Sequence, residues 1–113
     1  MYTYNCKLLR VIDGDTVTAQ IDLGFDVWVT KTIRLTGINA PESRTRDKIE
    51  KEKGLAAKAR LIEMLEGMKF KVQSFGVGKF GRCLGVLFVD DVNLNELLIT
   101  EGHAVEYHGG KRK

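Results

Sequence analysis

The stretch VIDGDTVTAQIDL, residues 11–23, contains the signals that decide the fold. From Thr16 to Leu23 it alternates polar and apolar side chains, which is the two-residue period of a half-buried β-strand. The Asp-Gly pair at residues 13 and 14 lies between two apolar runs and is typical of a hairpin turn. Residues 2–12, before the turn, are rich in β-forming side chains. We therefore predict a β-hairpin at this end of the chain.

Three further strands are predicted from runs of β-branched and aromatic side chains. They cover residues 27–35, 68–75 and 82–89. The run at 27–35 must end before Pro41, because proline has no N–H group and disfavours helix at the residue before it.

Two helices are predicted from their capping signals. Asp47 followed by Glu50 resembles a capping box, and Gly67 stands where a helix commonly ends. The face of this first helix that is expected to be buried consists of Leu55, Ala59, Ile62 and Leu65. Asn93 is expected to cap a second helix over residues 93–102.

The order of these elements is strand, strand, strand, helix, strand, strand, helix. It favours a mainly β protein of the α+β class, namely a closed five-stranded barrel of the OB type with two packed helices. The segregation of strands from helices argues against a doubly wound α/β sheet. No linker or repeat interrupts the sequence, so we expect a single domain over residues 1–113.

Composition excludes several classes of protein. The chain has 113 residues, 43% of them hydrophobic. It lacks the run of roughly 18 apolar residues that a membrane helix needs. Its first residues do not resemble a secretory signal, so we expect a cytoplasmic, monomeric protein with no membrane partner. Residues 42–82 carry eleven basic and six acidic side chains, which is compatible with an anionic polymer as partner, although a solvated basic face is the favoured explanation of the excess alone.

Several charged and polar side chains stand at predicted strand ends. Asp15 has the parity of the inward-facing positions in its strand, which places a carboxylate at the rim of the barrel; a simpler interpretation is that it caps the turn. Arg34 ends the third strand, Glu42 follows Pro41, and Arg82 opens the last strand. Carboxylates, an amide and two guanidinium groups together suit the hydrolysis of phosphodiesters.

Four motifs in the chain resemble those of the staphylococcal nuclease family, and they occur in the family's order. They are VIDGDTV at 11–17, IRLTGINAPE at 33–42, KFGR at 79–82, and the stretch from NLNELL at 93–98 to GHA at 102–104. The resemblance implies an OB barrel and a calcium-dependent endonuclease that cleaves DNA and RNA with little sequence specificity, leaving 3′-phosphate ends. Glu42 then resembles the general base that activates water, and Arg34 and Arg82 resemble the pair that binds the scissile phosphate.

The resemblance also implies a calcium site. Asp15 resembles the aspartate that ligates calcium, and Ala40 stands at the residue that donates a backbone carbonyl. Asn39 departs from the family, which has a second aspartate at this place. Because calcium affinity follows the charge of the ligands, we expect weaker binding of Ca²⁺. Asp13 offers compensating charge from beyond the ligands.

The nucleotide itself is expected to contact Lys79, Phe80 and Tyr107, which match or approximate binding residues of the family. An alternative function is an OB module that binds nucleic acid and has lost turnover because of Asn39. A structural barrel that binds other proteins is a third interpretation, but it leaves the charges at the strand ends without a role.

Overall fold

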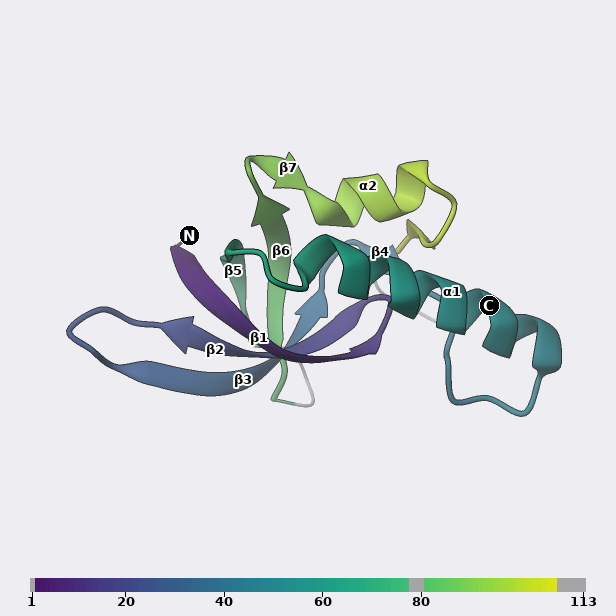
Figure 1. The fold of residues 1–113 in the computed structure, drawn as a ribbon, viewed down its shortest axis with the longest axis horizontal. Helices are drawn as coiled ribbons and strands as arrows, with labels where there is room; N and C mark the ends of the chain where they lie inside the picture. The colour runs from purple at the N-terminus through teal and green to yellow at the C-terminus, as the bar shows by residue number, and fades with distance from the viewer. Residues whose placement is uncertain (1, 78–80, 108–113) are drawn as a thin grey trace.

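The computed structural model describes residues 2–77 and 81–107, and Figure 1 shows their arrangement. The strands are β1 (Thr3–Asp13), β2 (Thr16–Asp22), β3 (Trp28–Leu35), β4 (Ile38–Asn39), β5 (Phe70–Val77), β6 (Cys83–Val89), β7 (Val92–Asn93) and β8 (Val105–Glu106). The helices are α1 (Lys48–Leu65) and α2 (Leu94–Thr100). Neither described helix has the length and apolar character needed to span a membrane.

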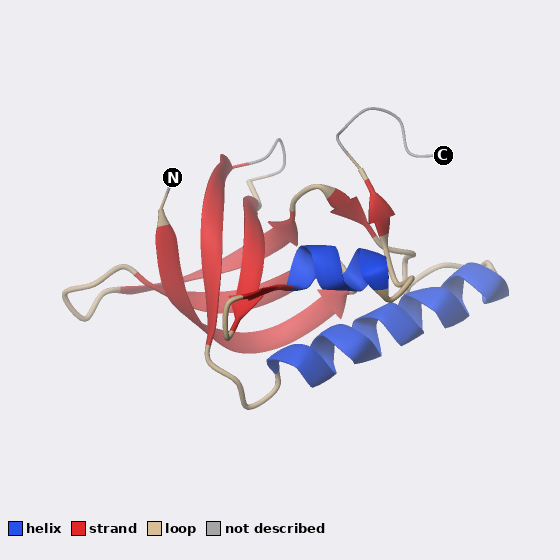
Figure 2. Cartoon of the chain, turned by 90° about the horizontal axis from the view of Figure 1, so that it is seen from above, coloured by secondary structure: helices blue, strands red, loops and turns tan. Residues whose placement is uncertain are grey.

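Five strands form a closed barrel, as predicted for an OB fold. They pair antiparallel in the order β3, β2, β1, β5, β6, and a parallel pairing of β3 with β6 closes the ring. Ile33 lies opposite Cys83 in this closing pair, and Leu35 lies opposite Gly85. Figure 2 shows the two helices together beside the red strands, where α1 contacts β1 and α2 contacts β6.

The barrel interior follows the alternation that the sequence predicted for β2. Val17, Ala19 and Ile21 are buried, and the polar residues between them are half-buried. The core is completed by the largest fully buried side chains, which are Phe70, Ile33, Leu35, Ile38, Leu61, Leu65, Leu87 and Leu98.

Both predicted helix caps are confirmed. The Asp47 carboxylate accepts hydrogen bonds from the N–H groups of Ile49 and Glu50, at 3.0 and 3.2 Å. Asn93 caps α2 by accepting from the N–H of Glu96 at 3.1 Å. At the other end of α1, Gly67 has a φ of 71°, the left-handed conformation that glycine adopts without strain.

The predicted buried face of α1 is wrong in part. Leu55 is 46% exposed and Ala59 is also exposed, whereas Gly54, Ala57, Leu61, Met64 and Leu65 are the buried residues of the helix. The reason is the close approach of the middle of α1 to the turn between β1 and β2. A Cβ atom on Gly14 in that turn would lie 2.6 Å from the Cβ of Ala57, so only the smallest side chains fit there.

A buried asparagine joins α2 to the strand pair that closes the barrel. The Oδ1 atom of Asn95 accepts from the N–H of Leu87 at 3.2 Å. Its Nδ2 group donates to the carbonyls of Thr36 and Gly85, at 2.8 and 3.2 Å. One side chain thus satisfies backbone groups of β6 and of the segment that follows β3.

Candidate active site

A cleft of about 290 Å³ opens where the β1–β2 turn, the end of β3 and the segment after β4 meet. It is lined by Asp13, Asp15, Thr16, Arg34, Asn39, Ala40, Glu42, Arg82 and Tyr107. The structure therefore brings together all the predicted catalytic and metal-binding residues, with Tyr107 beside them. Lys79 and Phe80, the other two predicted substrate contacts, lie outside the described residues.

Asp15 lies in the β1–β2 turn and is buried, with an exposed fraction of only 6%. Its Oδ1 atom accepts from the hydroxyl of Thr16 at 2.9 Å, and its Oδ2 atom accepts from the N–H of Ala40 at 2.8 Å. Burial of a carboxylate is tolerated because these donors and a nearby guanidinium offset the lost hydration. The contact with Ala40 joins the turn to the segment after β4.

Arg34 extends from the end of β3 into this cluster. Its Nη2 atom lies 3.4 Å from Oδ2 of Asp15 and 3.4 Å from Oδ1 of Asn39. The guanidinium also donates from Nη1 to the carbonyl of Leu35 at 2.7 Å and from Nη2 to that of Ile38 at 2.9 Å. The positive charge is thus held in a defined position between the two side chains that were predicted as metal ligands.

Two very short strands, which the sequence did not reveal, hold the segment that carries Asn39. In β4, Ile38 lies opposite Glu106 of β8, and Asn39 lies opposite Val105. The N–H of Tyr107 donates to the carbonyl of Gly37 at 2.9 Å.

Glu42 and Arg82 complete the cleft from two other parts of the chain. Glu42 is exposed, directly follows Pro41 and lines the cleft. Arg82 is half-buried and immediately precedes β6. The cleft therefore combines three carboxylates, those of Asp13, Asp15 and Glu42, with two guanidinium groups.

The donor set at the base of the cleft suits a hard cation that binds few charged ligands. Asp15 offers a carboxylate, Asn39 an amide oxygen and Ala40 a carbonyl, which are the oxygen donors that Ca²⁺ takes. Within the described residues, no three His, Cys, Asp or Glu side chains cluster closely enough to hold a metal ion. The oxygen donors are thus of the type that a cation binds, with a smaller negative charge than a site with two aspartates would have.

Two polar residues at this site were missed in the sequence. Thr16 donates to Asp15, and the buried Ser43 donates to Asp13 through both its N–H and its hydroxyl group. In the sequence, each of them is a small hydroxyl residue directly next to a predicted functional residue. Such neighbours are too common in proteins to indicate a functional role.

A second, larger cavity of about 440 Å³ shares the lining residues Asn39 and Ala40 with this cleft and lies between the start of α1 and the turn after α2. Its charged lining consists of Asp47, Glu50 and Lys53, with His103 beside them. Because both arginines and Glu42 line the smaller cleft instead, we assign the chemistry to that cleft.

Comparison with known proteins finds one matching family model and several relatives. A family model described as staphylococcal nuclease homologue matches residues 32–113. A probable staphylococcal-like nuclease of Oryza sativa subsp. japonica is 36% identical over 75 residues, which are 66% of this chain and 21% of that protein. A staphylococcal-like nuclease of Arabidopsis thaliana is 32% identical over the same shares of both chains. An uncharacterized protein of Bacillus anthracis is 26% identical over 91% of this chain and 47% of its own length. The chain thus spans about a fifth of the length of the plant relatives.

Proposed function

Because this chain belongs to the staphylococcal nuclease family, we propose that it is a calcium-dependent endonuclease that hydrolyses phosphodiester bonds in DNA and RNA with little sequence specificity. One observation carries the proposal. An accessible carboxylate, Glu42, lines the same cleft as two guanidinium groups, those of Arg34 and Arg82, and as the buried Asp15. A module that only binds nucleic acid has little use for this combination.

In the proposed reaction, Glu42 accepts a proton from the water that attacks the phosphorus atom. Arg34 and Arg82 donate hydrogen bonds to the phosphate oxygens, on which negative charge grows during the attack. The 5′-O–P bond breaks, the leaving 5′-oxygen takes up a proton from solvent, and the 3′-phosphate remains on the other product. Asp15, Asn39 and Ala40 would hold the calcium ion, which supplies positive charge to the phosphate when it is bound.

The position of Arg34 suits this role. Its guanidinium is held by the backbone carbonyls of Leu35 and Ile38, so it needs little reorganisation when the phosphate arrives. Preorganised donors of this kind stabilise the transition state more effectively than donors that must first be ordered.

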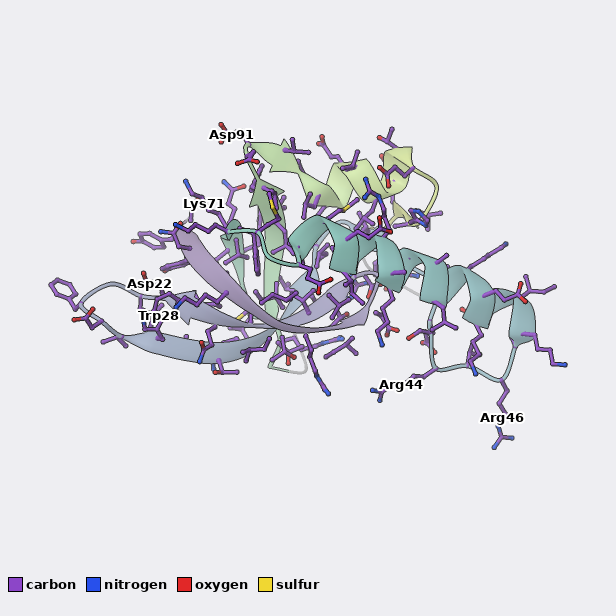
Figure 3. All side chains as sticks on the ribbon, viewed as in Figure 1. Asp22, Trp28, Arg44, Arg46, Lys71 and Asp91 are labelled. Carbon is purple, nitrogen blue, oxygen red and sulfur yellow. The ribbon has the colours of Figure 1, made fainter. Side chains whose placement is uncertain are left out.

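Basic side chains on the loop after Glu42 support a polyanionic substrate. Arg44 and Arg46 are exposed on the loop that follows Glu42, and Figure 3 shows both pointing away from the body of the protein. Charges in such positions contact phosphates without reading bases, which fits low sequence specificity.

The second candidate function is binding of nucleic acid without turnover, and Asn39 is the observation that favours it. The amide removes one negative charge from the proposed calcium site. A single experiment separates the two functions. Plasmid and single-stranded DNA are incubated with the protein in millimolar calcium or in chelator, and cleavage and binding are measured in parallel.

If the protein is an enzyme, the wild type cleaves DNA in the presence of calcium. The cleavage rate then falls about 10²–10⁴-fold in the variant Glu42→Gln, because a positioned base is lost. The matched control is Glu52→Gln, which removes the same charge from the exposed surface of α1. Near-normal turnover by Glu42→Gln would refute the role of Glu42. Binding to DNA without cleavage at any calcium concentration would favour the second function.

A further inference from the structure

The segment that carries Glu42 is fixed at both of its ends by one turn. At its start, the N–H of Ala40 donates to Oδ2 of Asp15 at 2.8 Å. At its end, the N–H of Ser43 donates to Oδ1 of Asp13 at 3.1 Å, and the Ser43 hydroxyl donates to the same oxygen. Asp13 and Asp15 flank a single glycine. The two acids of one hairpin therefore hold the two ends of a four-residue segment.

Helix α1 also packs closely against this segment. A Cβ atom on Gly54 would overlap the carbonyl group of Glu42 and would lie 2.7 Å from the backbone nitrogen of Ser43. Gly54 is buried in the interior of the helix, where glycine is less favourable than alanine by about 1 kcal/mol. The close approach of the Glu42 backbone explains why a helix contains glycine at this position.

The burial of Ser43 shows how tightly this contact is packed. Its exposed fraction is 5%, whereas Glu42 directly before it is exposed. The backbone at Glu42 is thus held between the end of β1 and the middle of α1, while its carboxylate extends into the cleft.

We propose that Asp13, Ser43 and Gly54 are positioning residues that set the location of the Glu42 carboxylate, and we call these three residues the Glu42 brace. The proposal rests on the function proposed above, because it assumes that Glu42 is the base. It also gives Asp13 a role other than the compensating charge near the metal that the sequence indicated. A displacement of about 1 Å at a reacting group can lower the rate about 10²-fold, so such a brace matters for turnover.

The first test is a double-mutant cycle on kcat. Ser43→Ala is expected to lower kcat about 10-fold or more with little change in KM, because the base is displaced while substrate contacts remain. In the background of Glu42→Gln, the same change is expected to have almost no further effect, since Ser43 acts through Glu42. The matched control is Ser74→Ala on β5, outside the residues that line the cleft. Equal effects of Ser43→Ala in both backgrounds would overturn the proposal.

The second test separates geometry from charge at Asp13. Asp13→Asn keeps an acceptor oxygen for Ser43, so we expect it to retain more kcat than Asp13→Ala. The calcium concentration for half-maximal binding, measured by calorimetry, is expected to change little in Asp13→Asn. A similar loss of kcat in both variants, together with a large shift in calcium binding, would instead assign Asp13 to the metal and overturn the brace.

The third test uses the sign of a stability change. For an unconstrained helix, Gly54→Ala would stabilise the fold by about 1 kcal/mol. The brace predicts a lower melting temperature and a lower kcat, because the Glu42 backbone must move. A stabilised variant with normal turnover would overturn the assignment of Gly54.

One measurement tests the brace without any catalytic activity. If the wild type cleaves no DNA, the function proposed above is wrong, but this measurement still shows whether the Glu42 segment is held as described. Hydrogen exchange at the Ser43 amide is expected to be slow in the wild type, because this N–H donates to Asp13, and fast in Asp13→Ala, which lacks the acceptor. Fast exchange of the Ser43 amide in the folded wild type would overturn the brace.

Discussion

Adding a carboxylate at residue 39 gives the sharpest test of the proposed calcium site. Asn39→Asp adds one negative charge where the side-chain oxygen lies 3.4 Å from Nη2 of Arg34. Asp15 lies at the same distance from the same nitrogen, so the two carboxylates would be close neighbours around one cation site. We expect the variant to bind calcium more tightly than the wild type.

The size of the gain follows from competing electrostatic effects. Two unit charges 4 Å apart interact by about 4 kcal/mol at an effective dielectric constant of 20. Repulsion from Asp15 and the lost hydration of the new carboxylate offset much of this attraction. The side chains of Asp15 and Arg34 are only 9% and 15% exposed, so water screens charges at this place weakly. Part of the gain in calcium affinity should therefore remain. We expect calcium affinity to rise about 10–100-fold, which corresponds to about 1.4–2.8 kcal/mol.

The assay is a calcium titration by calorimetry, with cleavage of one DNA substrate followed in parallel. The control is Asn93→Asp, which adds the same charge at the cap of α2, where aspartate caps as well as asparagine does. If Asn39→Asp shows unchanged calcium binding, residue 39 is not part of the metal site, and the reasoning about charge at the base of the cleft is wrong.

Three further predictions concern other parts of the structure. Arg34→Lys and Arg82→Lys should each lose most DNA cleavage while circular dichroism remains native, because lysine keeps the charge but not the two-pronged donor geometry. Asn95→Ala should lower the free energy of unfolding in urea by about 2–4 kcal/mol, since buried backbone groups lose their partner; a change below about 1 kcal/mol would contradict its structural role. The hydrogen bond from Arg60 holds the pKa of Glu101 below its ordinary value, so this pair stabilises the fold at neutral pH and the contribution disappears as the pH falls through that lowered pKa. The stability difference between wild type and Glu101→Gln should therefore shrink on acidification, as measured by urea unfolding at pH 7 and pH 3.

Most strands and helices could be predicted from the sequence, because each of them is signalled by a few residues that are neighbours in the chain. The alternation in β2 and the caps at Asp47 and Asn93 are properties of a few consecutive side chains, and the structure confirms them. Motif order then identified the family and, through it, the side chains that meet in the cleft.

The features of the structure that were not predicted depend on contacts between segments that lie far apart in the sequence. The buried face of α1 was misjudged because Leu55 is more apolar than Gly54, yet Gly54 is the residue that the backbone of Glu42 approaches. The pairing of β4 with β8 involves two residues on each side, too few to give a periodic pattern. The contact of Asp13 with Ser43 joins residues thirty positions apart, and nothing in either local sequence indicates it.

The pairing of β4 with β8 also has a consequence for the newly made protein. Synthesis proceeds from the N-terminus at about 5–20 residues per second, so Asp15 and Glu42 leave the ribosome well before Val105 does. Until then the strand with Asn39 lacks its partner, and Tyr107 has not joined the cleft. A nascent chain therefore carries an incomplete cleft until the segment that contains β8 has left the ribosome, and the proposed cleavage would be possible only after that point.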